Sequence, residues 1–273
     1  MDQGFFLILK SIIMGIVEGV TEFLPISSTG HMIIIGHFLN FEGDFAKLFE
    51  IVIQLGAILA IIVLFKNKIY GSLKNLTPGK YGFKLWSSIV VAFIPFGIIA
   101  FLFHDKVEEV LMKPLPVSLA LLVGGIWIIY AENKYRNNNK IVRIEDINYK
   151  QAFIIGLFQC LAVLWPGFSR SASTIIGGWI VGLSTVAAAE FSFFLALPTM
   201  VIATVYSLLK TKLILSAADI MSLIVGFIVS FWVALIVVDK FIAYIQQKPM
   251  KVFAVYRIII GVLLLGMILM NIL

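Results

Sequence analysis

Two glutamates separated by one helical turn are the first residues that could do chemistry. Glu18 and Glu22 are four positions apart, so on a helix their carboxylates lie on the same face. Apolar residues surround them, which argues against a solvated helix face. Carboxylates this close repel each other in an apolar setting unless a cation or a proton intervenes. The pair could therefore bind a divalent cation, act as a general base, or balance a positive charge from elsewhere in the chain.

A polar segment follows Pro25 and carries three hydroxyl groups and a histidine. These are Ser27, Ser28, Thr29 and His31. An activated hydroxyl or an imidazole can attack phosphorus, so Ser28 and His31 are both candidate nucleophiles. The sequence leaves the choice between them open. The other two histidines, His37 and His104, lack such neighbours and are expected to be structural.

A second polar segment follows Pro166 and carries a single arginine among serines. These are Ser169, Arg170, Ser171 and Ser173. A guanidinium at membrane depth costs at least ~2.5 to 3.5 kcal/mol unless it is paired or solvated. Arg170 could bind phosphate through two parallel hydrogen bonds. The alternative is a structural ion pair with a carboxylate of the first polar segment.

The composition indicates an integral membrane protein. Of 273 residues, 61% are apolar and only 13% are charged. The net charge of +6 comes from basic residues scattered between apolar runs, which excludes a nucleic-acid partner. The single cysteine, Cys160, excludes an intrachain disulfide and a cysteine-based metal cluster. We expect one membrane domain over residues 1–273, and no cleavable signal, because no basic segment precedes the first apolar stretch.

Six segments are long and apolar enough to span a bilayer, which takes about 20 residues per helix. They are Leu48 to Phe65, Leu85 to Phe103, Pro114 to Ala131, Phe191 to Leu209, Ile220 to Val238 and Val252 to Leu273.

Two further apolar regions are interrupted halfway by proline, glycine and serine, which favour a break in a helix. The first runs from Phe5 to Leu24 and resumes from Met32 to Leu39; the second runs from Gln151 to Trp165 and resumes from Ile175 to Leu183. The resumed parts are too short to cross a membrane. Both regions are therefore predicted to be re-entrant helix-loop-helix hairpins, whose irregular backbone lines a polar cavity.

The two hairpins match when the chain is laid on itself with an offset of 141. Gly15 then falls on Gly156, Glu18 on Gln159, Pro25 on Pro166, and Ser28 on Ser169. Each half consists of one hairpin and three spans, over residues 1–135 and 148–273. The predicted fold is an all-α polytopic membrane protein built as a repeat.

Charge orients the two halves. Residues 66–84 carry five lysines and no acid, and residues 132–150 carry five basic and three acidic residues, so both loops are predicted to be cytoplasmic. Residues 104–113 carry two basic and three acidic residues and are expected outside. Both termini then lie outside, and the two repeats are inverted relative to each other.

Inverted hairpins bring two helix N-termini toward one point near the middle of the membrane, where their free N–H groups favour an anion such as phosphate. The candidate substrate-binding residues are Ser27, Thr29, Ser169, Arg170, Ser171 and Ser173. Two function classes fit. One is a membrane-embedded phosphohydrolase, and the other is a secondary transporter or flippase of a phosphorylated lipid.

Three other charged residues lie within apolar helices. Glu50 and Glu190 are predicted to cap their helices, with an indirect contribution to the site as the alternative. Arg257 is predicted to extend its side chain toward the membrane surface from near its helix end.

The segment Glu18-Gly-Val-Thr-Glu22-Phe-Leu-Pro25-Ile-Ser-Ser28-Thr-Gly-His31, with Pro166-Gly-Phe-Ser169-Arg170-Ser171 and Glu190-Phe-Ser-Phe, closely resembles the bacterial undecaprenyl-diphosphate phosphatases, or bacitracin-resistance proteins. The likeness covers essentially the whole chain.

That resemblance implies hydrolysis of undecaprenyl diphosphate, which recycles the lipid carrier for peptidoglycan synthesis and gives bacitracin resistance. It carries catalytic roles to Glu18, Glu22, Ser28, His31 and Arg170, with Ser169 alongside. It also implies a divalent cation, Mg or Ca, with Glu18 and Glu22 as ligands. The resemblance further implies a homodimer in the bacterial cytoplasmic membrane, with the site open to the outer side.

Overall fold

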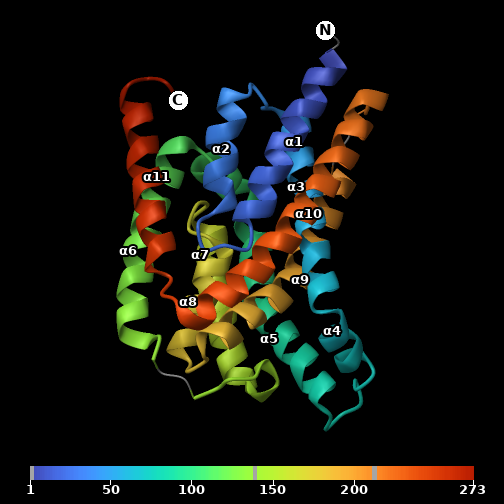
Figure 1. Cartoon of the computed structure of the whole chain (residues 1–273), viewed down its shortest axis with the longest axis vertical. Helices are drawn as coiled ribbons and strands as arrows, with labels where there is room; N and C mark the ends of the chain where they lie inside the picture. Colours follow the sequence, from blue (N-terminus) through green and yellow to red (C-terminus); the bar gives the residue numbers. More distant parts are fainter. Residues whose placement is uncertain (1–2, 138–139, 211–213) are drawn as a thin grey trace.

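The computed structural model describes residues 3–137, 140–210 and 214–273, with the side chain of His104 left out. The first half contains α1 (Gln3–Thr21), α2 (Ser28–Phe38), α3 (Asp44–Leu64), α4 (Lys66–Leu73), α5 (Tyr81–Leu111) and α6 (Pro114–Tyr135). The second half contains the short 3-10 helix η1 (Ile144–Asp146), α7 (Tyr149–Leu164), α8 (Arg170–Ile180), α9 (Thr185–Lys210), α10 (Ala217–Gln247) and α11 (Lys251–Leu269) (Figure 1). The predicted all-α class is confirmed.

Seven helices of the described residues are long and apolar enough to cross a membrane, which confirms a polytopic membrane protein. Six are the predicted spans, and the seventh is α1, which was expected to be part of a hairpin. Helices α5 and α10 have 31 residues each, or roughly 46 Å, and continue well past the predicted ends of their apolar stretches. Hydropathy marks only the apolar part of a helix, whereas backbone hydrogen bonding continues into polar residues.

The two predicted hairpins are broken at their prolines. The first break, residues 22–27, separates α1 from α2, and the second break, residues 165–169, separates α7 from α8. Proline has no N–H and cannot continue a helix, so Pro25 and Pro166 prevent one continuous helix. Each new helix begins after a serine, Ser27 or Ser169, whose hydroxyl accepts the backbone N–H three residues further on, at 3.4 and 3.3 Å.

Helices α2 and α8 also have the same length and the same ending. Each has 11 residues and is followed closely by a residue of positive φ, Asn40 at 46° and Gly182 at 93°. In both, the next N–H donates to the carbonyl five residues before it, at 2.8 Å. The match therefore pairs Ser27 with Ser169, and the predicted pairing of Ser28 with Ser169 was wrong by one position, because the second break has one more residue after its proline. A repeat of the whole halves stays a prediction.

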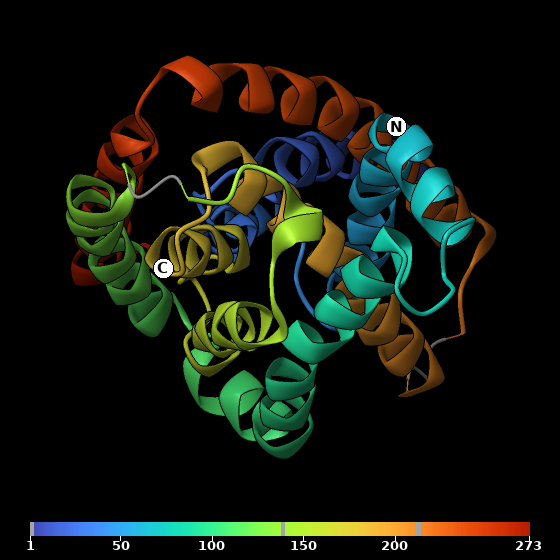
Figure 2. The ribbon, with the colours of Figure 1, turned by 90° about the horizontal axis from the view of Figure 1, so that it is seen from below.

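The halves are interlocked in space. Helix α1 packs along α10, α7 packs along α5, and α6 packs along α11. A Cβ atom on Gly15 would lie 2.7 Å from the carbonyl oxygen of Gly226 in α10, and one on Gly156 would lie 2.1 Å from that of Ala92 in α5. Both glycines therefore allow a close approach of helices. Figure 2 shows the long helices surrounding α2 and α8, and nine of the 11 residues of α8 are buried.

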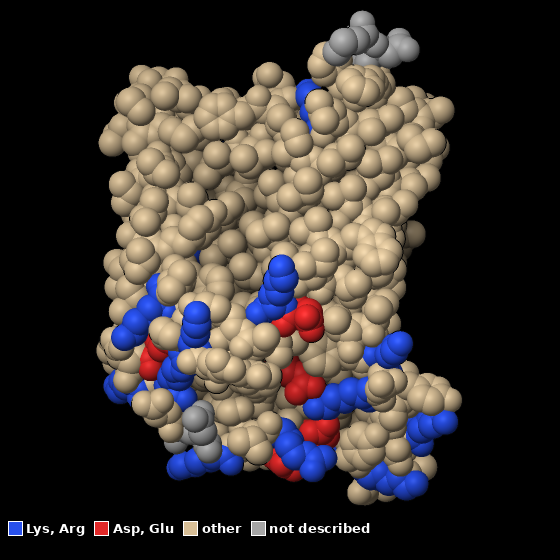
Figure 3. Space-filling model, in the orientation of Figure 1, with Lys and Arg blue, Asp and Glu red and all other residues tan. Residues whose placement is uncertain are grey.

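Charged side chains are unevenly distributed on the face of the molecule that Figure 3 shows. On the face drawn in Figure 3 they gather at the lower end, where α4 and the connection from α6 to α7 lie. Both chain ends lie at the opposite, upper end (Figure 1). In the same view α1 descends from the upper end toward the middle and α2 returns, while α7 rises from the lower end and α8 returns. The predicted orientation in the membrane, the inversion of the repeats and the re-entry of the hairpins into a bilayer stay predictions.

Candidate active site

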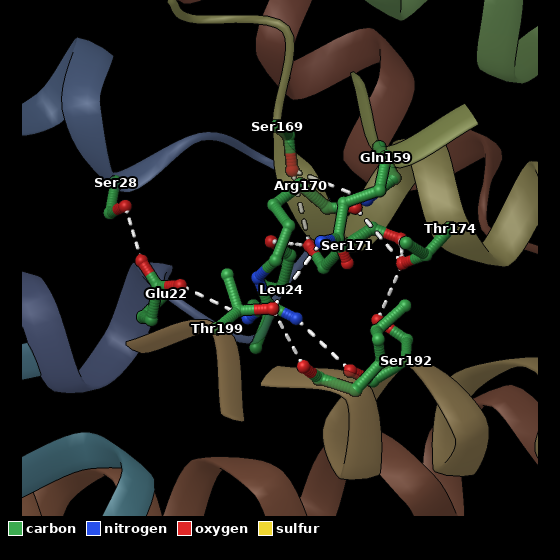
Figure 4. Close-up of polar contacts among 12 residues, drawn as sticks. Glu22, Leu24, Ser28, Gln159, Ser169, Arg170, Ser171, Thr174, Ser192 and Thr199 are labelled. Carbon is green, nitrogen blue, oxygen red and sulfur yellow. Dashed lines mark hydrogen bonds and ion pairs between the residues drawn. The ribbon is translucent and has the colours of Figure 1, made fainter. Parts of the chain in front are cut away.

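Ser28 and Arg170 hold the same place in two equivalent helices, since each is the first residue after a break. Glu22, at the end of α1, binds both of them. Its Oε2 accepts a hydrogen bond from Ser28 Oγ at 2.6 Å, and its Oε1 lies 3.0 Å from Arg170 Nη2 (Figure 4). One carboxylate thus joins a hydroxyl of its own hairpin to the guanidinium of the other.

The Arg170 guanidinium is held on two sides. Nη1 donates to the carbonyl oxygen of Ser192 in α9 at 3.1 Å, opposite the contact with Glu22. Nε is buried without a partner among the described residues. The ion pair that the sequence offered as an alternative is therefore formed. It leaves other N–H groups of the five-donor fork for an anion, so pairing and anion binding are compatible.

The backbone is strained immediately before both residues. Ser27 and Ser169 have φ of 70° and 74°, in a region that residues with a side chain rarely adopt. Such a conformation costs on the order of 1–3 kcal/mol and persists only where the surroundings enforce it. Here it turns the chain sharply, so that Ser28 and Arg170 begin their helices facing one space.

That space is a cavity of about 210 Å³. The sequence-predicted residues that line it are Glu22, Ser27, Ser28, Thr29, Ser169 and Arg170. Apolar side chains of α5, α7 and α9, including Phe96, Val163 and Met200, form much of the remaining wall. The polar residues of the cavity can bind a charged headgroup, and its apolar side chains can contact a hydrocarbon chain attached to that headgroup.

Two predicted substrate-binding serines do not line this cavity. Ser171 Oγ donates to the carbonyl oxygen of Leu24 in the first break at 2.8 Å, and Ser173 Oγ donates to that of Ser169 at 2.9 Å. The Ser171 bond joins the second hairpin to the first break, whereas the Ser173 bond lies within the first turn of α8.

His31 is fully engaged away from the cavity. Its Nδ1 lies 2.7 Å from the carbonyl oxygen of Ser27, and its Nε2 lies 2.8 Å from the Tyr256 hydroxyl of α11. A carbonyl can only accept, so Nδ1 carries a proton, and Nε2 shares a hydrogen bond with the Tyr256 hydroxyl. Both nitrogens that could act as a nucleophile are therefore engaged in hydrogen bonds.

Glu18 is buried one turn before Glu22, with 1% of its surface exposed. Its Oε1 has no partner among the described residues, and it does not line the cavity. Both oxygens of Glu22 are occupied by Ser28 and Arg170. No three metal-ligating side chains converge among the described residues. The described residues therefore do not form a complete metal site by themselves, and the divalent cation stays a prediction.

Three polar residues of the site were not predicted. Gln54 of α3 and Thr199 of α9 line the cavity, and Gln159 of α7 donates through Nε2 to Thr199 Oγ1 at 3.3 Å. Each is a polar residue within a largely apolar helix; Gln54 lies one turn after Glu50, and Thr199 directly follows Pro198. These positions were the available signal in the sequence, but only the packing of α3, α7 and α9 brings the three side chains together.

The predicted roles of three charged residues were wrong. Neither Glu50 nor Glu190 caps its helix, because each lies more than one turn inside it. Glu190 instead pairs with Lys68 at 2.7 Å, and Lys68 also pairs with Glu145 at 3.0 Å. Arg257 does not reach the surface and is completely buried.

Of the two remaining histidines, His37 forms an exposed contact of 3.2 Å with Glu42, in agreement with a structural role. The side chain of His104 lies outside the described residues.

A carboxylate-bound serine and a guanidinium that meet inside a polytopic helical protein define a membrane enzyme that acts on a phosphorylated substrate. The chain belongs to the family of the bacitracin resistance protein BacA, whose family model matches residues 11–263.

Curated relatives support this over nearly the whole chain. Proteins named undecaprenyl-diphosphatase are 54% identical in Clostridium novyi, covering 99% of both chains, and 52% identical in Clostridium tetani, covering 95% of this chain and 96% of the relative. The one from Caldanaerobacter subterraneus subsp. tengcongensis is 54% identical and covers 96% of both chains.

We expect replacement of Arg170 by lysine to lower kcat/KM by about 10- to 100-fold, the cost of losing a charge-assisted hydrogen bond. The planar guanidinium can contact Glu22, the Ser192 carbonyl and an anion at the same time, and the smaller ammonium group of lysine cannot. Phosphate release by purified protein measures the effect. Arg143→Lys, at an exposed position near η1, is the matched control and should keep normal activity. Normal phosphate release by the Arg170→Lys protein would contradict a role of the Arg170 guanidinium in binding the phosphate.

Proposed function

We infer that this chain hydrolyses undecaprenyl diphosphate to undecaprenyl phosphate and inorganic phosphate, which recycles the lipid carrier for peptidoglycan synthesis and gives resistance to bacitracin. The observation that carries this inference is the bond of 2.6 Å between Ser28 Oγ and Glu22 Oε2 beside Arg170, in a cavity with a polar and an apolar wall. Relatives more than half identical over nearly the whole chain have this name. A transporter or flippase has only the hairpin layout in its favour.

In the proposed first step, the Ser28 oxygen attacks the terminal phosphorus of the diphosphate. Glu22 Oε2 takes the hydroxyl proton across the existing hydrogen bond. The bond from the terminal phosphorus to the bridging oxygen breaks, and undecaprenyl phosphate leaves with the electron pair. The Arg170 guanidinium and the N-terminal N–H groups of α2 and α8 stabilise the negative charge on the phosphoryl oxygens.

In the proposed second step, water attacks the phosphoserine. Glu22 first passes its proton to solvent and then accepts one from the attacking water, and the Ser28 oxygen leaves and is reprotonated. Inorganic phosphate departs, and the site returns to its starting state. The apolar wall with Phe96 and Met200 suits the lipid chain, which remains outside the polar end throughout.

Ser28 is proposed over His31 as the nucleophile because of what each group touches. Ser28 lines the cavity and its hydroxyl points to a carboxylate. His31 does not line it, and both its nitrogens are bonded to other groups. His31 then orients the backbone of Ser27, directly before the nucleophile.

We expect Ser28→Ala to lose at least about 10³-fold in turnover, because the attacking oxygen is removed. Ser87→Ala, at a half-buried serine of α5 that does not line the cavity, is the matched control and should keep normal activity. Phosphate release from undecaprenyl diphosphate in detergent, where no membrane gradient exists, measures both and also separates hydrolysis from transport.

Trapping the intermediate with substrate labelled on the terminal phosphate gives a second test. A phosphoserine is stable to acid and labile to base. An acid-labile, base-stable linkage, or full turnover by Ser28→Ala, would overturn the choice of Ser28.

We propose that a divalent cation, Mg or Ca, enters the site bound to the diphosphate of the substrate rather than as a resident ion. Two observations support this proposal. Both Glu22 oxygens already contact Ser28 or Arg170. Mg in enzymes is commonly coordinated by substrate phosphates and only one or two carboxylates. Such an ion would add positive charge beside Arg170, where the phosphoryl oxygens become more negative during the reaction.

A chelator should therefore lower turnover by about tenfold or more, and added Mg or Ca should restore it. Equilibrium dialysis of the substrate-free protein against labelled Ca should detect no stoichiometric binding. Tight binding of one ion per chain without substrate would contradict entry with the diphosphate.

We also propose that the molecule lies in the bacterial cytoplasmic membrane as a homodimer, with both termini and the opening of the site on the outer side. The basic loops gather at the end of the molecule opposite the termini, and such loops favour the cytoplasmic side. The homodimer rests on the family resemblance alone.

Labelling of single cysteines in a Cys160→Ser background tests the orientation. In intact cells, an impermeant maleimide should modify Lys113→Cys, between α5 and α6, and leave Lys74→Cys, after α4, unmodified until the cells are opened. Equal modification of both positions in intact cells would refute the proposed orientation.

A further inference from the structure

A guanidinium without a carboxylate partner lies behind the active site. Arg257 of α11 has no exposed surface, and no carboxylate of the described residues pairs with it. Its Nη1 donates to the carbonyl oxygen of Pro25 at 3.2 Å, and its Nη2 donates to those of Gly167 at 3.1 Å and Ala120 at 3.2 Å. All of its hydrogen bonds that the structure contains therefore go to the backbone.

Two of these carbonyls belong to the two breaks. Pro25 lies in the first break, two residues before Ser27, and Gly167 lies in the second break, two residues before Ser169. Carbonyl groups in a broken helix lack their helical N–H partners and need another donor inside an apolar protein. One planar group supplies both, so the distance between the breaks is set by the width of a guanidinium. The third carbonyl, of Ala120, connects the same guanidinium to α6.

The neighbouring residue of α11 makes a second contact with the first hairpin. The Tyr256 hydroxyl lies 2.8 Å from His31 Nε2, one turn into α2. Successive residues of α11 therefore hold α2 and the break before it. No residue of α11 lines the cavity, so Arg257 and Tyr256 act on the two hairpins from outside it.

Insertion of an arginine into the apolar part of a membrane costs free energy. A well-packed apolar side chain at the same position would avoid this cost of removing a charge from water, so packing alone does not explain Arg257. Its geometry is specific to the two breaks that precede Ser28 and Arg170. We propose that Arg257 is a positioning residue of the phosphatase reaction, which holds the two breaks at the separation where Ser28 and Arg170 reach the same phosphorus. This proposal rests on the roles given to Ser28 and Arg170 above.

The chain offers a second way to disturb the same group. A Cβ atom on Gly124 of α6 would lie 2.2 Å from Arg257 Nη2, and 2.9 Å from its Cζ. The clash is with the end of a flexible side chain, so Gly124→Ala displaces the guanidinium while Arg257 itself remains. Gly266 of α11 has no atom within 4 Å of such a Cβ, so Gly266→Ala is the matched control.

The experiment compares Arg257→Lys, Gly124→Ala, the double variant and Gly266→Ala as purified, monodisperse protein with undecaprenyl diphosphate. Arg257→Lys and Gly124→Ala should each lower kcat by about 10- to 100-fold, with KM changed by less than about threefold, because binding of the lipid chain is untouched and alignment is lost. Inhibition by orthovanadate, which mimics the five-coordinate phosphorus, should weaken more than inhibition by inorganic phosphate. Gly266→Ala should behave like the unchanged protein.

The double variant tests whether both changes act through one group. Its loss should equal that of the more damaging single variant, because the guanidinium contact can be removed only once. Losses that multiply would overturn the proposal, since Gly124 and Arg257 would then act independently.

A lower melting temperature with normal kcat in the folded protein would also overturn it, because that is the result of a purely structural role. If Arg257→Lys does not fold, Gly124→Ala decides alone by the same measurements. The proposed function fails by a different result, which is full turnover by Ser28→Ala.

Discussion

The active site depends on one carboxylate that is shared between the two halves of the chain. Glu22 closes the first hairpin by accepting from Ser28, and it binds the second hairpin through Arg170. Each charge offsets the other, which lowers the free-energy cost of burying both in this apolar interior. Pairing keeps both at membrane depth and leaves the arginine with further donors for an anion. The interaction therefore assembles the site and prepares it for a phosphate at the same time.

A break in a helix within an apolar protein exposes backbone groups that must find partners, and this requirement explains much of the surrounding polarity. Ser171 and Ser173 donate to carbonyls near the breaks, and Arg257 donates to one carbonyl in each break. The serines and arginines around the two breaks thus have two roles. Some donate hydrogen bonds to backbone carbonyls, and others line the cavity.

The two hairpins are alike in backbone and unlike in chemistry. Their short helices start from serines with the same strained φ, and both start positions point to the cavity. The first start position holds the hydroxyl Ser28 and the second holds the guanidinium Arg170. A related pair of backbones has therefore been given the two complementary groups that phosphoryl transfer needs, a nucleophile and a positive charge.

The sequence by itself determined the membrane class, the two breaks and the residues that meet there, because apolar length and proline act locally. It also singled out Glu22, Ser28 and Arg170, since polar groups inside apolar helices need a reason to be there. Tertiary structure alone decided which group touches which. It turned His31 toward Tyr256 and away from the cavity, occupied the carboxylate expected to hold a metal, and buried Arg257 between the breaks. Those outcomes depend on helices far apart in the chain, whose packing no local pattern records.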